Sequence, residues 1–81
     1  MFTNKLENGR SNVCGVQIAK YRKQMKKSQR ELAEDLQRQG LDVDKNAIQR
    51  IEAGKRFVTD IELVYIRKAL KLSYEELLSQ N

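Results

Sequence analysis

Hydrophobic residues recur along the chain at the spacing of α-helices, in blocks separated by polar breaks. From about Val13 to Met25 the apolar residues are four, three and four positions apart, at Cys14, Ile18, Tyr21 and Met25. This spacing places them on one face of a helix. No stretch alternates between polar and apolar residues with a period of two, so we expect no strand. The pattern predicts an all-α chain.

Capping boxes mark the starts of three further helices. In this motif a Ser or Thr is followed three residues later by Glu, and each side chain accepts a hydrogen bond from the backbone N–H of the other residue. The pairs are Ser28 with Glu31, Thr59 with Glu62, and Ser73 with Glu76. They predict helices that begin at residues 28, 59 and 73, the last one short and ending at about residue 79.

One more helix is expected between the second and the fourth. Asp44 is its N-cap, and Val43 and Ile48 flank this cap as a hydrophobic staple. Gly40 ends the preceding helix and Gly54 ends this one, because glycine adopts the left-handed conformation of a C-cap without penalty. The chain therefore contains two short capped helices joined by the link 41–43, within five helices in all.

The apolar positions of these helices predict a single small core. Residues 1–12 show little periodicity and are expected to form a flexible N-terminal arm, with one domain over residues 13–81. A chain of 81 residues has room for one core only. Its expected members beyond the first helix are Leu32, Ala33, Leu36, Ile48, Ile51, Leu63, Ile66, Leu70, Leu72 and Leu77.

The charge of the chain favours a polyanionic partner. There are 16 Lys and Arg residues against 11 Asp and Glu residues, and residues 1–56 hold 13 of the basic and 7 of the acidic ones. The positive field thus belongs to the part that contains the two linked helices. On charge alone, a solvated basic face that serves solubility explains the excess equally well.

Several functional classes have no support in the sequence. There is no histidine, a single cysteine (Cys14) and no glycine-rich phosphate loop, so we expect no enzyme, no metal site and no cofactor. One cysteine forms no internal disulfide, which suits a reducing cytoplasm. No apolar run approaches the ~20 residues of a membrane span, and the N-terminus lacks the apolar stretch of a signal peptide.

The order and spacing of four motifs resemble the helix-turn-helix domain of phage repressors and Cro, the lambda-repressor-like (XRE) family. They are Arg22 seven residues before Gln29, Ser-Gln-x-x-Leu-Ala at 28–33, Ile-x-Arg-Ile-Glu-x-Gly-Lys-Arg at 48–56, and Leu-Lys-Leu-Ser-x-x-Glu-Leu-Leu at 70–78. The resemblance implies a five-helix DNA-binding domain. Residues 37–42 add about five residues to the common form of the family, which predicts an extended turn between helices two and three.

The polar face of the third helix is the candidate reading surface. Arg and Lys suit the O6 and N7 acceptors of guanine, and Asn and Gln suit the N6–N7 edge of adenine. By the pattern of the family, the residues that meet base edges are Lys45, Asn46, Gln49 and Arg50. The resemblance also implies phosphate contacts at the start of helix two and after helix three, from Ser28, Gln29, Lys55 and Arg56. The alternative is an ordinary solvated helix face.

The resemblance gives Arg22 and Glu52 a structural role. It implies a partly buried ion pair that joins helix one to helix three. Removing one partner of such a pair leaves the other charge buried without compensation.

Together these features predict a sequence-specific regulator that binds double-stranded DNA, a repressor of bacterial or phage origin in the cytoplasm. We expect a homodimer on a pseudo-palindromic operator, with an interface on the last helix formed by Tyr74, Leu77 and Leu78, and with Tyr65 as a further candidate. No small-molecule ligand or membrane partner is expected. The alternative is a protein-interaction module of the same fold, such as an antitoxin or a polymerase adaptor. A membrane-surface binder lacks the bulky apolar face that it needs.

Overall fold

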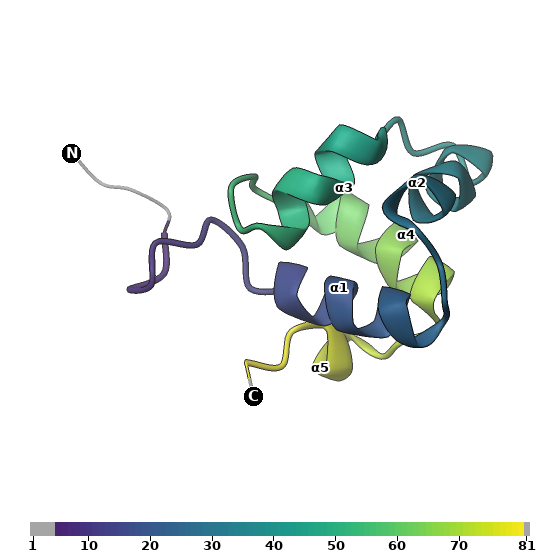
Figure 1. The fold of residues 1–81 in the computed structure, drawn as a ribbon. Helices are drawn as coiled ribbons and strands as arrows, with labels where there is room; N and C mark the ends of the chain where they lie inside the picture. Colours follow the sequence, from purple (N-terminus) through teal and green to yellow (C-terminus); the bar gives the residue numbers. More distant parts are fainter. Residues whose placement is uncertain (1–4, 81) are drawn as a thin grey trace.

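The computed structural model describes residues 5–80, and within them the chain forms five helices and no strand. The helices are α1 (Gly15–Gln24), α2 (Gln29–Arg38), α3 (Lys45–Glu52), α4 (Asp60–Leu70) and α5 (Tyr74–Leu77), as Figure 1 shows. The predicted all-α, five-helix fold is confirmed. None of these helices is long and apolar enough to span a membrane.

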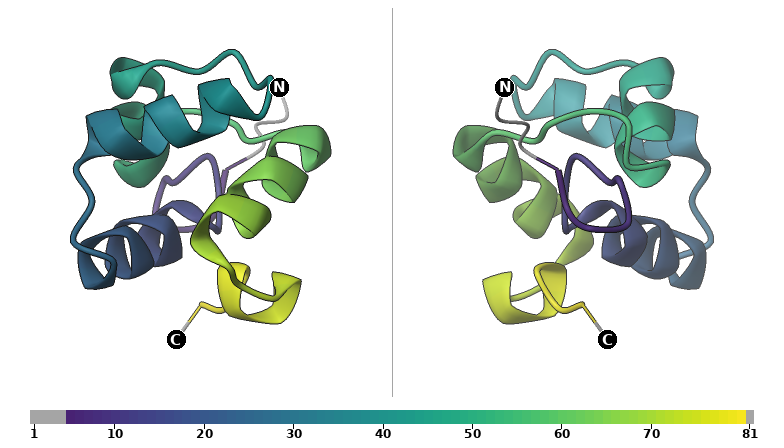
Figure 2. Two further views of the ribbon diagram at one scale, coloured as in Figure 1. Left: turned by 90° about the vertical axis from the view of Figure 1, so that its right-hand side faces the viewer. Right: turned by 90° about the vertical axis from the view of Figure 1, so that its left-hand side faces the viewer.

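The helices α2 and α3 pack against each other, and α1 and α4 support them from the other side. The helix α1 contacts α3, α4 and α5, whereas α4 contacts α1 and α2. Figures 1 and 2 place the short helix α5 at the end of the molecule opposite α3. The outer side of the α2–α3 pair is therefore left uncovered by the other helices.

The core matches the predicted apolar faces. The fully buried hydrophobic residues are Cys14, Ile18, Leu32, Ala33, Leu36, Val43, Ile48, Ile51, Ile66, Leu70, Leu72 and Leu77, and Tyr21, Met25 and Leu63 are partly buried against them. Burial raises the pKa of the Cys14 thiol to about 11, because desolvation disfavours the thiolate. Cys14 is thus a neutral core residue at physiological pH.

The helix starts predicted from the sequence are present with their hydrogen bonds. All three capping boxes are formed, and the Asp44 carboxylate accepts from the backbone N–H of Ala47 at 2.8 Å. Gly40 follows α2 with φ at +97°. There the N–H of Leu41 donates to the carbonyl of Leu36 at 3.0 Å, which satisfies an otherwise unpaired carbonyl at the helix end.

The link between α2 and α3 is the extended turn that the sequence predicts. It runs over residues 39–44, longer than the 3–4 residues usual between such helices. The side-chain amide of Gln37 donates to the carbonyl of Val43 at 2.7 Å, and Val43 is buried. These two contacts fasten the link to α2 and to the core, so the longer link does not leave α3 loosely attached.

Part of the predicted N-terminal arm packs against the end of α3. The Asn12 amide donates to the carbonyls of Ile51 at 2.9 Å and Arg56 at 2.8 Å, and the Arg10 guanidinium donates to the carbonyl of Glu52 at 2.9 Å. The packed part of the chain thus begins at about residue 10. The flexibility of residues 5–9 stays a prediction, and residues 1–4 of the expected arm lie outside the described residues.

A glycine allows this close approach of α1 and α3. A Cβ atom on Gly15 would lie 2.1 Å from the carbonyl oxygen of Ile51 and 2.7 Å from the Oδ1 atom of Asn12. The Asn12 Oδ1 atom accepts from the N–H of Gly15 at 2.8 Å. The start of α1 therefore fits against the end of α3 only without a side chain at position 15.

Candidate nucleic-acid interface

The predicted reading residues all lie on the outer face of α3. Lys45, Asn46, Gln49 and Arg50 are exposed, whereas Ile48 and Ile51 on the opposite face are 0 % and 1 % exposed. The two buried isoleucines fix the rotation of the helix, because turning it would bring apolar side chains into water. The same rotation directs the four polar side chains outward and together.

The start of α2 lies beside this face and offers backbone donors. The capping box uses the N–H groups of Ser28 and Glu31, and no hydrogen bond among the described residues engages those of Gln29 and Arg30. A surface hollow here is lined by Arg22, Ser28, Gln29, Arg30 and Lys45. Free N–H groups at the positive end of a helix, with cationic side chains around them, suit a phosphate group.

One carboxylate joins α1, α2 and α3 behind the hollow. The Glu52 Oε2 atom accepts from Arg22 Nε at 2.7 Å, and its Oε1 atom accepts from Arg22 Nη2 at 3.0 Å. The same Oε1 atom accepts from Gln29 Nε2 at 2.9 Å. The hydrogen bond with Glu52 raises the pKa of Arg22 above its ordinary value. The structure thus brings together Arg22, Glu52 and Gln29, which are far apart in the sequence.

The two basic residues after α3 have different surroundings. Lys55 is exposed, and no ion pair or hydrogen bond of the described side chains engages its ammonium group. Arg56 is instead paired with Glu62 of α4, with its Nη2 atom 2.9 Å from Oε2 and its Nη1 atom 3.1 Å from Oε1. The guanidinium of Arg56 is therefore directed into the protein, and Lys55 is the cation that faces solvent.

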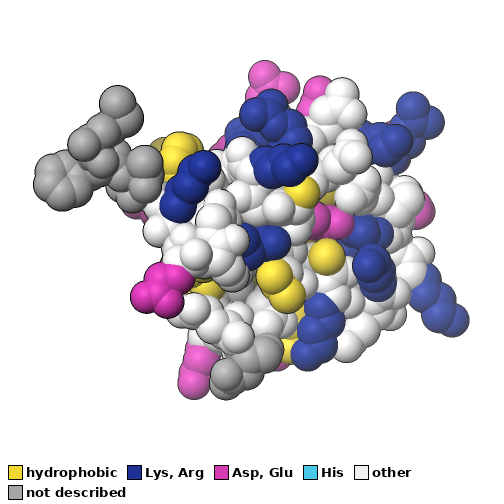
Figure 3. Space-filling view, turned by 60° about the vertical axis from the view of Figure 1, so that its left-hand side comes forward, with side chains coloured by type: hydrophobic (Ala, Val, Ile, Leu, Met, Phe, Trp, Pro, Cys, Tyr) yellow, Lys and Arg dark blue, Asp and Glu magenta, His cyan; other side chains and the backbone are white. Residues whose placement is uncertain are grey.

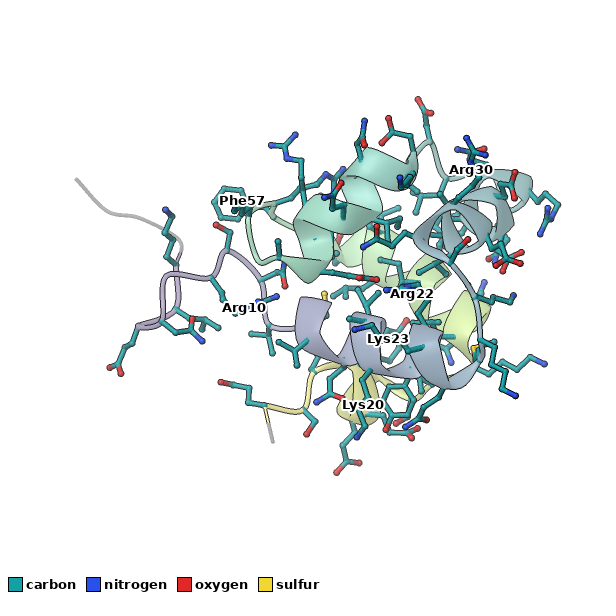
Figure 4. The ribbon with its side chains drawn as sticks, viewed as in Figure 1. Arg10, Lys20, Arg22, Lys23, Arg30 and Phe57 are labelled. Carbon is teal, nitrogen blue, oxygen red and sulfur yellow. The ribbon has the colours of Figure 1, made fainter. Side chains whose placement is uncertain are left out.

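Other basic residues surround these elements unevenly. Figure 3 shows Lys and Arg side chains spread over one face of the molecule from its top to its lower right. In Figure 4, Arg30 extends on the outer side of α2, whereas Lys20 lies on the side of α1 that is turned toward α5. The Lys20 ammonium lies over the ring of Tyr21, 5.2 Å from its centroid. Lys27 is ion-paired with Asp35 of α2, and this contact lowers the pKa of the Asp35 carboxyl.

The comparison with known families agrees with this geometry. The family model described as Helix-turn-helix matches residues 18–77, which is more than half of the chain. The chain belongs to the lambda-repressor-type helix-turn-helix family. No curated protein and no solved structure matches it. The family is one of DNA-binding regulators. We refer to α2, the link and α3, which lie within the matched residues, as the helix-turn-helix unit.

Three contacts of this helix-turn-helix domain were not found by sequence reasoning. They are the amide contact of Gln29 with Glu52, the pairing of Arg56 with Glu62, and the attachment of Arg10 and Asn12 to the end of α3. Two of them join residues 23 to 44 positions apart, for which spacing gives no signal. Among residues 5–80 no cluster of His, Cys, Asp and Glu forms a metal site.

Proposed function

We propose that this helix-turn-helix protein binds double-stranded DNA sequence-specifically and regulates transcription, with α3 in the major groove. The observation that carries the proposal is the exposed set Lys45, Asn46, Gln49 and Arg50 on a helix whose other face is fixed in the core. These side chains offer both donors and acceptors, which direct readout of base edges requires. A face that serves solubility needs only charged side chains, whereas the amides of Asn46 and Gln49 carry no charge.

Phosphate contacts on either side of α3 would hold the helix in the groove. On the α2 side, Ser28 and Gln29 lie at the start of the helix, where the backbone N–H groups of Gln29 and Arg30 are unengaged. On the other side Lys55 is exposed. Arg56 remains a phosphate candidate only through the part of its guanidinium that Glu62 leaves open, and its side chain is 28 % exposed. Such contacts set position and affinity, while base contacts set sequence.

We further propose a homodimer on a pseudo-palindromic operator. One α3 helix covers only a few base pairs, and the two half-sites of such operators lie about 34–36 Å apart, so a second copy is expected to occupy the second half-site. Leu77 is 0 % exposed and serves the core, so the apolar side chains left for a partner here are Tyr74 of α5 and Leu78 directly after it, at 45 % and 43 % exposure.

The loop after α3 and the start of α4 offer a second and more exposed apolar surface. Phe57 is 55 % exposed and Ile61 is 65 % exposed. Figure 4 shows Phe57 beyond the end of α3, on the side of the molecule that carries this helix. We therefore place the contact between copies at Phe57 and Ile61 rather than on α5.

The resemblance to phage repressors supports a repressor of bacterial or phage origin that acts in the cytoplasm. Selection from a random pool of duplex DNA with the purified protein tests the function. An enriched palindrome is expected. Salt-sensitive binding without enrichment would mean that charge alone is recognised. Absence of binding would favour a protein-interaction module, such as an antitoxin or a polymerase adaptor.

A further inference from the structure

We propose that Glu52 is a positioning residue for DNA contact, because it fixes the side-chain amide of Gln29 at the edge of the reading surface. The proposal rests on the function proposed above and assigns Glu52 a role beyond its ion pair with Arg22. Glu52 is the last residue of α3, and Gln29 is the first residue of α2. Their contact therefore joins the two helices of the helix-turn-helix unit, and Gln29 itself lines the hollow at the start of α2.

The carboxylate of Glu52 is itself held firmly. Arg22 donates to both of its oxygens, at 2.7 Å and 3.0 Å, and the side chain of Glu52 is only 9 % exposed. Arg22 also donates through Nη1 to the carbonyl of Lys27 at 2.8 Å, in the turn that leads into α2. The acceptor offered to Gln29 is thus fixed relative to both α1 and the start of α2.

This acceptor determines which way the Gln29 amide faces. A carboxylate accepts hydrogen bonds and donates none, so the nitrogen of the amide must point toward Glu52 and the oxygen away from it. One N–H of Nε2 is used at 2.9 Å. No hydrogen bond among the described residues engages the second N–H or the amide oxygen. Those two groups remain for DNA, one as a donor and one as an acceptor.

The groups around the Gln29 side chain favour its second N–H, rather than its oxygen, as the group that contacts a phosphate. The unengaged backbone N–H groups of Gln29 and Arg30 lie at the same helix start, and the hollow also carries Arg22 and Lys45. The charge of Glu52 would by itself repel a phosphate, but the paired Arg22 compensates it. Glu52 therefore orders a donor beside an anion site without making that site negative.

A double-mutant cycle separates positioning from bracing. DNA affinity is measured for the wild type, Glu52→Ala, Gln29→Ala and the double variant, on the duplex enriched from the random pool, at a temperature where circular dichroism shows all four folded. We expect Glu52→Ala to weaken binding at least fivefold in the wild-type background and less than twofold when Gln29 is already alanine. Lys55→Ala is the matched control, and its effect should multiply with that of Glu52→Ala.

Equal losses from Glu52→Ala with and without Gln29 would overturn the proposal and leave Glu52 as a brace alone. A wild type that binds no duplex would remove both this proposal and the function on which it rests. Where Glu52→Ala does not fold, the wild type supplies the test by NMR. The side-chain amide protons of Gln29 should exchange with water more slowly than those of the exposed Gln24 and Gln39. Equally fast exchange would overturn the proposal.

Discussion

Arg56 and Glu62 are joined by two parallel hydrogen bonds, with Nη2 at 2.9 Å from Oε2 and Nη1 at 3.1 Å from Oε1. Glu62 also belongs to the capping box that starts α4, so one carboxylate fastens the loop after α3 to the helix that follows it. Arg56, for which the resemblance implied a phosphate contact, thus helps to hold the loop that contains Lys55 and Phe57. This loop carries Lys55, the proposed phosphate contact, and Phe57, which belongs to the proposed contact between copies.

The Arg56–Glu62 pair predicts a pH-dependent stability. The hydrogen bond from Arg56 holds the pKa of Glu62 below its ordinary value of 4.5. A carboxyl with a lowered pKa stabilises the fold above its ordinary pKa and loses this contribution as the pH falls through the lowered one. Glu62→Gln should therefore cost about 1–3 kcal/mol at pH 7, and its difference from the wild type should shrink below pH 4.5. Urea unfolding of both proteins at pH 7 and at a pH below 4.5 measures the difference in their free energies of unfolding.

The exposed Glu34 of α2 supplies the control for that experiment. Glu34→Gln should change the free energy of unfolding little at either pH, because surface charges contribute little. A Glu62→Gln variant that stays equally destabilised in acid would show that packing, rather than the charge of Glu62, accounts for the loss.

The Arg22–Glu52 pair predicts a larger effect on stability. Arg22 is 8 % exposed, so Glu52→Ala leaves a guanidinium in the interior without its partner. Breaking a buried pair in this way costs about 3–5 kcal/mol. Thermal unfolding followed by circular dichroism should show a much lower melting temperature than for Glu34→Ala. Equal melting temperatures for the two variants would contradict the structural role of the pair.

The position of Gly15 predicts that Gly15→Ala destabilises the domain, whereas helix propensity alone would predict the opposite. Alanine favours a helix over glycine by about 1 kcal/mol, but the added Cβ would lie 2.1 Å from the Ile51 carbonyl oxygen. The two backbones must separate, so Gly15→Ala should destabilise the domain by roughly 1–3 kcal/mol. Gln24→Ala, on the exposed side of α1, is the control. A Gly15→Ala variant more stable than the wild type would show that α1 and α3 are not in this contact.

The exposed apolar side chains of Phe57 and Ile61 lead to a prediction about how many copies of the protein bind one duplex. Replacing Phe57 and Ile61 by serine removes the two most exposed large apolar side chains among residues 5–80. Sedimentation of the complex with a palindromic duplex should then show one protein per duplex at concentrations where the wild type binds as two. Leu78→Ser, directly after α5, should leave the ratio at two. The opposite pattern would place the contact between copies on α5.

Local signals in the sequence predicted the helices well, while contacts between distant residues were missed, except for the Arg22–Glu52 pair that the resemblance implied. Ser28 and Glu31 form their box within one helical turn, so their spacing alone reports it. Asn12 meets Arg56 across 44 positions, and only the packing of α1 on α3 brings them together. Arg56 shows the same limit at short range. The resemblance to the family implied a phosphate contact for Arg56, but the orientation of α4 supplies Glu62 as a partner.

The claim that α3 reads sequence is tested most directly by repeating the random-duplex selection with an altered reading face. The double variant Asn46→Ala and Gln49→Ala changes two exposed side chains on the outer face of α3. Its selection should lose preference at specific positions of each half-site while binding stays salt-dependent. Lys55→Ala should instead weaken binding uniformly and keep the enriched motif. An unchanged motif from the double variant would contradict the account.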